Sequence, residues 1–194
     1  KMVVADNANV LVGLMEARQT WRSWDVVVLI VLLSVRILFD FSGYSDIAIG
    51  LSKIIGLDLP ANFNFPYIAS NIQDFWRRWH MSLSTWIRDY IYIPLGGSRQ
   101  GASRKMFNAL TAMALCGLWH GAAWHFMLWG IYHGLGMTVH TVYRKYCPAW
   151  GRTSKLYLGF AHALTLAFVG YGWLLFFFPM DKVLWYSRCL FARG

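Results

Sequence analysis

Two histidines, each directly after a tryptophan, have the residue types and surroundings that favour chemistry in this chain of 194 residues. His120 follows Trp119 in the segment Cys116–Trp124, within a stretch apolar enough to lie in a lipid bilayer. His80 follows Trp79 in a more charged segment. An ionisable group at bilayer depth is costly, so by default it marks a functional site. Because imidazole takes and returns a proton near neutral pH, His120 is a candidate general base.

A histidine base of this kind takes the proton from a hydroxyl while the oxygen attacks an activated acyl group. The reaction needs no metal and no covalent enzyme intermediate, but it needs a neutral imidazole, which burial among apolar groups favours. Gly121, directly after His120, permits a close approach of backbone or substrate. A hydrogen-bonded structural histidine is the alternative, and the spacing alone leaves both interpretations open.

Other classes of site find little support in the sequence. His125, His133 and His140 lie about two helical turns apart, too far for one ion to bridge them, and no HExxH motif occurs. Ser82 lies near His80, but no GxSxG elbow accompanies it. Walker A and Rossmann glycine patterns are also missing from the sequence. We therefore expect no metal and no bound cofactor.

The composition indicates an integral membrane protein. Hydrophobic residues make up 57% of the chain and charged residues only 14%, whereas a soluble domain carries about a quarter. The net charge of +9 would suggest nucleic acid in a soluble protein, but here basic residues flank apolar segments, as in cytoplasmic loops. We therefore expect acidic lipid headgroups, and no nucleic acid, to meet these residues. They are Arg99, Arg104, Lys105, Arg144, Lys145, Arg152 and Lys155.

Apolar runs predict several membrane-spanning helices, since a ~30 Å hydrocarbon core needs about 20 residues. Val26–Phe41 with its flanks forms the first span, and Leu156–Phe178 forms the last. Arg36 and Asp40 in the first run have the i, i+4 spacing that allows pairing, and Asp46 follows them. Mutual neutralisation inside a bundle is the favoured interpretation of these charges, and a substrate role is the alternative.

The apolar run Met106–Val142 is too long for one straight spanning helix at about 1.5 Å per residue. Two segments that turn near Trp119–Gly121 fit better, because they bring the basic loops Arg99–Lys105 and Arg144–Lys155 to the same side. This division places His120 near a break in helical structure, buried within protein or lining a water-filled cavity.

The segment before this run is more polar. Leu57–Ala69 is predicted to be a loop, because prolines and asparagines interrupt it. Asn71–Tyr90 is predicted to be one amphipathic helix, too charged to span, that lies in the interface or folds partly into the protein. The predicted fold is therefore an all-α, multi-pass transmembrane bundle with interfacial amphipathic helices, and residues 1–194 form a single membrane domain.

Several segments resemble the membrane-bound O-acyltransferase superfamily. Asp74–Gly97 closely resembles a hallmark segment of the bacterial branch that acts in alginate O-acetylation, peptidoglycan O-acetylation and teichoic-acid D-alanylation. Cys116–Trp124 is similar to the segment that holds the invariant histidine of this family. Further similar blocks follow in family order: Lys1–Asn7, Asp40–Asp46 and Trp129–Gly134.

This resemblance implies roles for both histidines. His120 would be the catalytic histidine of the family, and His80 the second conserved histidine, which shapes or polarises the site. The implied fold is a ring of transmembrane helices around a funnel where a cytoplasmic donor meets an external acceptor. The chain would be the carboxy-terminal portion of that fold, without the amino-terminal spans. It departs from the family at Leu174–Pro179, where relatives often carry an arginine after two phenylalanines.

Substrate-binding residues are also implied. Arg77, Arg78 and Arg88 would attract an anionic donor such as a coenzyme or a carrier phosphopantetheine, with headgroup anchoring as the equal alternative. Trp79 and Trp119 would contribute aromatic surface to the same site.

The implied function is transfer of an acyl group, with acetyl favoured, to hydroxyls of an exported cell-surface polysaccharide. The donor is expected to be a co-substrate, either acyl-CoA or an acyl carrier protein thioester. Expected partners are the lipid bilayer, the polymer and a periplasmic or extracellular acyltransferase, and the expected location is the bacterial plasma membrane. A transporter using Arg36, Asp40 and Asp46, and a non-catalytic membrane scaffold, remain the alternative functions.

Overall fold

The computed structural model describes residues 1–147 and 154–191. The described residues form helices and connecting turns without a strand, which confirms the all-α prediction. The chain divides into two compact units, Lys1–Ala61 with Trp173–Gly194, and Asn62–Gly172. The helix α7 (Lys155–Phe177) begins in the second unit and ends in the first.

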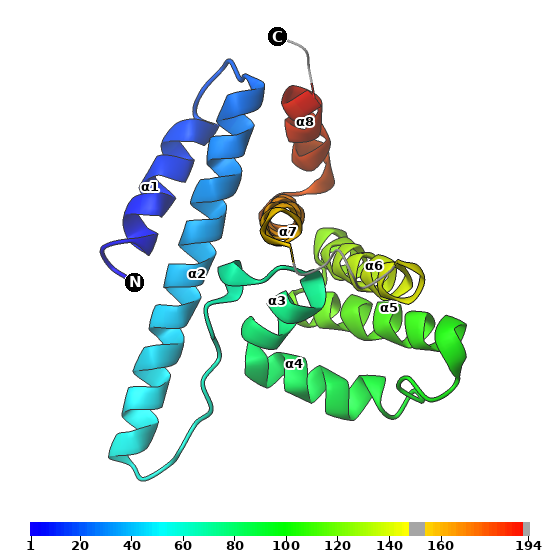
Figure 1. Cartoon of the computed structure of the whole chain (residues 1–194). Helices are drawn as coiled ribbons and strands as arrows, with labels where there is room; N and C mark the ends of the chain where they lie inside the picture. The colour runs from blue at the N-terminus through cyan, green and yellow to red at the C-terminus, as the bar shows by residue number, and fades with distance from the viewer. Residues whose placement is uncertain (148–153, 192–194) are drawn as a thin grey trace. The chain divides into compact units, whose positions relative to one another are not determined.

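In the first unit, α1 (Ala5–Glu16) packs along α2 (Ser23–Ile54), as Figure 1 shows. The start of α2 is fixed by Asp25, whose carboxylate accepts a hydrogen bond from the backbone N–H of Arg22 at 2.8 Å. Small and branched side chains are buried along the two helices, which removes apolar surface from the solvent. They are Ala5, Ala8, Val12, Val26, Leu29 and Leu33.

The helix α8 (Met180–Phe191) completes this unit by packing beside α2. The hydroxyl of Ser23 donates to the carbonyl of Cys189 at 3.0 Å. Lys182 pairs with Glu16 at 2.7 Å and so joins α8 to the end of α1. The segment that follows the last predicted span is therefore a helix packed on its own unit.

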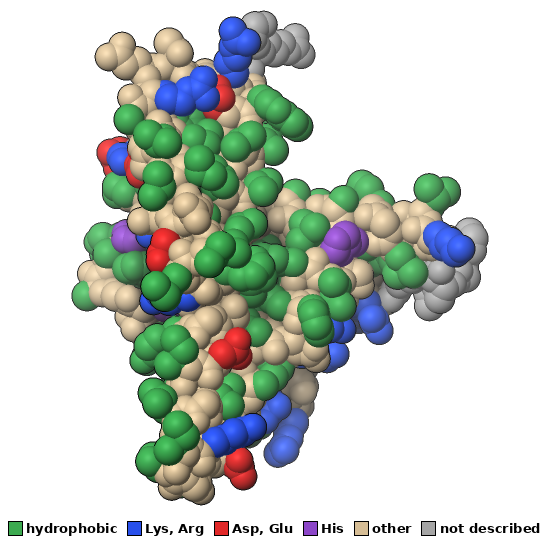
Figure 2. Space-filling view, turned by 90° about the vertical axis from the view of Figure 1, so that its left-hand side faces the viewer, with side chains coloured by type: hydrophobic (Ala, Val, Ile, Leu, Met, Phe, Trp, Pro, Cys, Tyr) green, Lys and Arg blue, Asp and Glu red, His purple; other side chains and the backbone are tan. Residues whose placement is uncertain are grey.

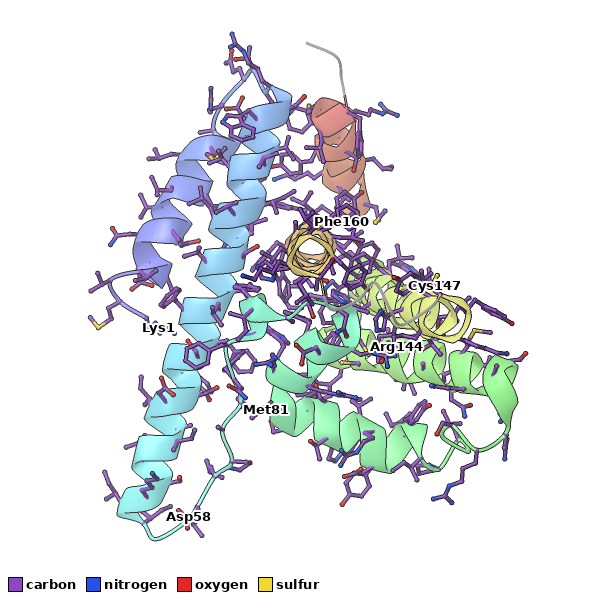
Figure 3. The ribbon with its side chains drawn as sticks, viewed as in Figure 1. Lys1, Asp58, Met81, Arg144, Cys147 and Phe160 are labelled. Carbon is purple, nitrogen blue, oxygen red and sulfur yellow. The ribbon has the colours of Figure 1, made fainter. Side chains whose placement is uncertain are left out.

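The charges of the first predicted span have separate partners within the first unit. Asp40 pairs with Lys1 at 3.0 Å, and Lys1 is labelled beside α2 in Figure 3. The guanidinium of Arg36 lies over the ring of Phe177, 5.0 Å from its centroid. Arg36 and Asp40 are thus each compensated by another group, and they do not pair with each other as the i, i+4 spacing suggested.

In the second unit, α5 (Gly101–His120) and α6 (Trp124–Tyr146) form an antiparallel hairpin (Figure 1). This confirms the predicted division of Met106–Val142 near residue 120. The helices approach closely because of two glycines. A Cβ at Gly117 would collide with the carbonyl of Phe126, and one at Gly130 would collide with the carbonyl of Met113.

The hairpin gathers basic residues at one end, as predicted. Arg104 and Lys105 lie at the start of α5, and Arg144 and Lys145 lie at the end of α6, where Figure 3 labels Arg144. Arg152, expected in the same group, lies outside the described residues.

The prediction of one amphipathic helix over Asn71–Tyr90 is wrong. The segment contains α3 (Ile72–Arg78), α4 (Met81–Ile87) and the start of a π-helical turn, η2 (Arg88–Tyr92). The helix breaks because Trp79 is extended and His80 adopts a left-handed backbone conformation, with φ of 43°. This break is the local structure that places His80.

The loop predicted over Leu57–Ala69 is confirmed apart from one short 3-10 turn, η1 (Pro66–Ile68). The loop has a structural role at the broken helix. Asn62 accepts the backbone N–H of Met81 with its carbonyl at 3.0 Å, and that of Ser82 with its side chain at 3.2 Å. Asn62 therefore satisfies the first free N–H groups of α4, which Figure 3 shows starting at Met81.

Within the described residues, α2 and α7 are long and apolar enough to cross a membrane. They contain most or all of the predicted spans Val26–Phe41 and Leu156–Phe178. Figure 2 shows hydrophobic side chains spread over the face of the molecule in view. The multi-pass bundle, which also requires α5 and α6 to span, stays a prediction, as does the single domain over residues 1–194.

The close approach of α5 and α6 leads to a first testable prediction. Gly117→Ala should lower the free energy of unfolding by about 1–3 kcal/mol, because its Cβ meets backbone that cannot move aside. Gly159→Ala in α7 is the matched control, since no atom lies within 4 Å of its added Cβ and alanine favours a helix. Thermal unfolding of the detergent-solubilised protein measures both, and equal melting of the two variants would contradict the packing described.

Candidate functional site

The second unit brings the two predicted histidines together. His120 is the last residue of α5, and His80 lies in the break between α3 and α4. The ring of Trp119 joins them, with its centroid 6.1 Å from that of His80 and 5.0 Å from that of His120. Both histidines contact this ring edge-on, at 69° and 81°. Two segments far apart in sequence therefore form one site.

His120 is half-buried among aromatic rings. Trp129 of α6 meets it at 5.3 Å in an edge-to-face arrangement, and Phe126 lies at 6.4 Å. Gly121 was expected to permit a close approach of backbone or substrate, and the group that approaches it is the side chain of Phe126, whose ring carbon lies 2.7 Å from the place of a Cβ on this glycine. A Cβ at position 121 would therefore require this ring to shift. The surroundings favour an uncharged imidazole, as the general-base hypothesis requires.

His80 is buried, with 8% of its surface exposed. Burial, together with a smaller effect of positive charge on His120, lowers the pKa of His80 from its ordinary value of 6.5 to about 4. His80 is therefore neutral at pH 7. Its left-handed backbone is unusual for a residue of this size, and such strain is found most often at functional sites.

A second pair of residues holds the ring of His80. Its Nδ1 lies 3.5 Å from Oγ of Ser82, and this hydroxyl donates to Oδ1 of Asn62 at 2.6 Å. In the sequence, Ser82 suggested only a nucleophile, and Asn62 belonged to no candidate site. Asn62 lies in an irregular loop, and no periodicity or motif marks such a residue as a neighbour of His80.

His133, considered in the sequence only as a metal ligand, lies in the aromatic core behind His120. It is fully buried, and its Nδ1 accepts a hydrogen bond from the indole N–H of Trp76 at 3.3 Å. Its ring packs on Trp129 at 5.0 Å, and Trp129 in turn contacts His120. His133 thus helps to fix the indole against which His120 lies.

The remaining predicted residues have different surroundings. Trp79 is buried and stacks on Phe75 at 5.6 Å, so its ring belongs to the core of the second unit. Trp119 is 61% exposed, which leaves much of its surface accessible beside the histidines.

The three arginines also differ from one another. Arg78 pairs with Asp74 at 3.0 Å and Arg88 with Asp89 at 2.7 Å. Arg77 is exposed and takes part in none of the ion pairs formed among the described residues. Of the three, Arg77 therefore keeps the positive charge most available to an anion.

For a metal ion, the described part of the chain offers no group of three or more histidine, cysteine or acidic side chains. The chemistry that the arrangement supports is proton transfer by neutral imidazoles held against aromatic rings.

The lowered pKa of His80 leads to a prediction for stability. Between pH 6.5 and about 4 the unfolded chain binds a proton at His80 that the folded chain does not, so stability should fall as the pH drops through this range. His80→Asn removes this titrating group and should show a smaller fall. Apparent melting temperatures of both proteins across this range measure the difference, and parallel curves would contradict the prediction.

The left-handed backbone leads to a separate prediction at pH 7. His80→Ala should unfold more readily than His80→Asn, by about 1 kcal/mol, because asparagine tolerates this conformation better than alanine. Chemical unfolding of the two variants side by side measures the difference. A more stable alanine variant would show that the backbone at this position is not strained.

Comparisons with known proteins match most of the chain. A family model described as MBOAT, membrane-bound O-acyltransferase family, matches residues 26–178. The chain is 43% identical over 143 residues to the peptidoglycan O-acetyltransferase of Helicobacter pylori. The aligned residues make up 74% of this chain and 27% of that protein.

Two further relatives show the same similarity. A probable alginate O-acetylase AlgI of Azotobacter vinelandii is 52% identical over 109 residues, 56% of this chain and 22% of that protein. The teichoic acid D-alanyltransferase of Bacillus subtilis is 36% identical over 154 residues, 74% of this chain and 38% of that protein. The chain thus spans between about a fifth and two fifths of the length of these relatives.

Proposed function

Because the chain belongs to the membrane-bound O-acyltransferase family, we propose that the protein transfers an acyl group to hydroxyls of an exported cell-surface polysaccharide. Acetyl is the favoured group, since two of the three relatives described above are named for O-acetylation. The family membership predicted from Asp74–Gly97 and Cys116–Trp124 is confirmed by the match over residues 26–178.

The observation that carries this proposal is the position of His120. It is a half-buried imidazole at the end of α5, enclosed by Trp119 and Trp129 and adjoining a second neutral histidine. In the proposed reaction His120 takes the proton of the acceptor hydroxyl as the oxygen attacks the thioester carbonyl. The tetrahedral intermediate then expels the thiolate, and the protonated His120 gives its proton to this leaving group.

His80 does not compete for the transferred proton, which therefore stays on the ring of His120. A positive charge on His120 opposes a positive charge on His80, and burial opposes it further. His80 therefore stays neutral when His120 is protonated. In this proposal His80 orients the reacting groups and His120 alone exchanges the proton.

The donor is proposed to be a thioester of coenzyme A or of an acyl carrier protein, used as a co-substrate. Arg77 is suited to attract its phosphate groups, since it is exposed, while Asp74 and Asp89 neutralise the neighbouring arginines. We place the protein in the bacterial plasma membrane, with the exported polymer or a periplasmic or extracellular acyltransferase as its partner.

The test is His120→Ala in the whole protein, which should abolish O-acylation while membrane insertion is retained. His140→Ala is the matched control: it removes a histidine of the same hairpin that lies about 24 Å along α6 from the start of that helix, at 1.5 Å per residue. Cells that carry each variant are compared for O-acyl content of their surface polymers and for protein in the membrane fraction. Wild-type acylation by His120→Ala would remove His120 from the mechanism.

The same experiment separates the alternative functions. A scaffold should support acylation without His120, provided that its complex assembles. A transporter should move a solute without an acyl donor. The residues that suggested a transport path were Arg36, Asp40 and Asp46, and the structure gives the first two partners within their own unit.

A further inference from the structure

A chain of hydrogen bonds runs from Asn62, in the loop before α3, through Ser82 to the ring of His80. Oδ1 of Asn62 accepts the hydroxyl proton of Ser82 at 2.6 Å and also the backbone N–H of Ser82 at 3.2 Å. The oxygen of that hydroxyl lies 3.5 Å from Nδ1 of His80. The three groups lie in one compact unit and close the break between α3 and α4.

The direction of these bonds determines which ring nitrogen carries the proton. The short bond to Asn62 uses the single hydroxyl proton of Ser82, because an amide oxygen only accepts. Toward His80 the serine oxygen then offers a lone pair. A contact between this oxygen and Nδ1 is attractive only if Nδ1 carries the proton.

We propose that Asn62 and Ser82 are positioning residues that hold His80 as the tautomer protonated on Nδ1. The unprotonated nitrogen of the ring is then Nε2. This proposal extends the function proposed above, on which its mechanistic consequence rests, and it concerns a property of His80 that is measured without turnover.

The consequence concerns what His80 can do for the reaction. With a lone pair on Nε2, the neutral ring accepts a hydrogen bond from an alcohol and does not donate one from this nitrogen to a carbonyl. Because the single proton of the reacting hydroxyl goes to His120, His80 is suited to orient the acceptor through a second, non-reacting hydroxyl rather than to polarise the thioester. The family resemblance implied that His80 shapes or polarises the site, and this geometry favours a role in shaping it.

The chain of hydrogen bonds Asn62–Ser82–His80, here called the relay, differs from the helix cap that Asn62 forms at the start of α4. Asn62 also accepts the backbone N–H groups of Met81 and Ser82, so its loss would disturb the start of α4 itself. The hydroxyl of Ser82 takes no part in these backbone bonds. Ser82→Ala therefore removes the relay and keeps the cap, and Asn62→Asp keeps an accepting oxygen for both.

The test is solid-state nuclear magnetic resonance of the full-length protein in lipid bilayers at pH 7, with histidine labelled with ¹³C and ¹⁵N. Loss of one ring signal in His80→Gln assigns the signal of His80. The expected signal has a protonated Nδ1 and an unprotonated Nε2. In Ser82→Ala it should shift toward the tautomer with the proton on Nε2, and in Asn62→Asp it should keep a protonated Nδ1.

Ser84→Ala is the matched control. Ser84 lies in the same helix, but its hydroxyl donates to the carbonyl of Trp79 at 3.2 Å. This variant should leave the ring signal of His80 unchanged. In an acyl-transfer assay, Ser82→Ala should lower kcat about tenfold or more, as expected when an orienting group for a histidine is lost. Ser84→Ala should keep it.

The outcomes separate the two proposals. A proton on Nε2 in the unaltered protein, or an unchanged signal in Ser82→Ala, overturns the relay even if His120→Ala is inactive. A protonated Nδ1 that shifts in Ser82→Ala supports the relay even if His120→Ala retains acylation and the proposed function fails.

Discussion

The close approach of α5 and α6 is the constraint on which the site depends. Gly117 and Gly130 let each helix lie against the backbone of the other, and no larger residue fits at either position. Because the hairpin is closed in this way, the end of α5 lies beside the start of α6 and the indole of Trp129 meets the ring of His120. Trp76 donates a hydrogen bond to His133, and the rings of both residues contact Trp129 and hold it in place.

The second constraint acts on His80 through the backbone. In a continuous helix over residues 71–90, the helical repeat alone would set the direction of the side chain at position 80. The left-handed conformation instead ends α3 and starts α4 at this residue, and Asn62 satisfies the N–H groups that the break exposes. The loop thus stabilises a locally unfavourable conformation, which places the imidazole against Trp119.

Periodicity and motif spacing were sufficient to predict much of this architecture. The hairpin at residue 120 and the two most apolar helices follow from run lengths and from the positions of basic residues. The break at His80 was missed, because its sequence has the helical period and contains neither glycine nor proline. Asn62 was missed for a related reason, since a contact between a loop and a distant helix end leaves no periodic signal. Both depend on tertiary contacts, which local propensity does not contain.

The distribution of charge gives the proposed chemistry its particular character. Residues 90–180 contain no aspartate or glutamate, so α5, α6 and α7 supply no carboxylate to stabilise a protonated His120. The groups that orient its neighbour His80 are a hydroxyl and an amide, which are also uncharged. A proton on His120 therefore has no anionic partner on these helices. Such a base holds its proton only weakly and returns it readily to a departing thiolate, which suits transfer from a thioester to an alcohol, where a proton is taken up and given back within one turnover.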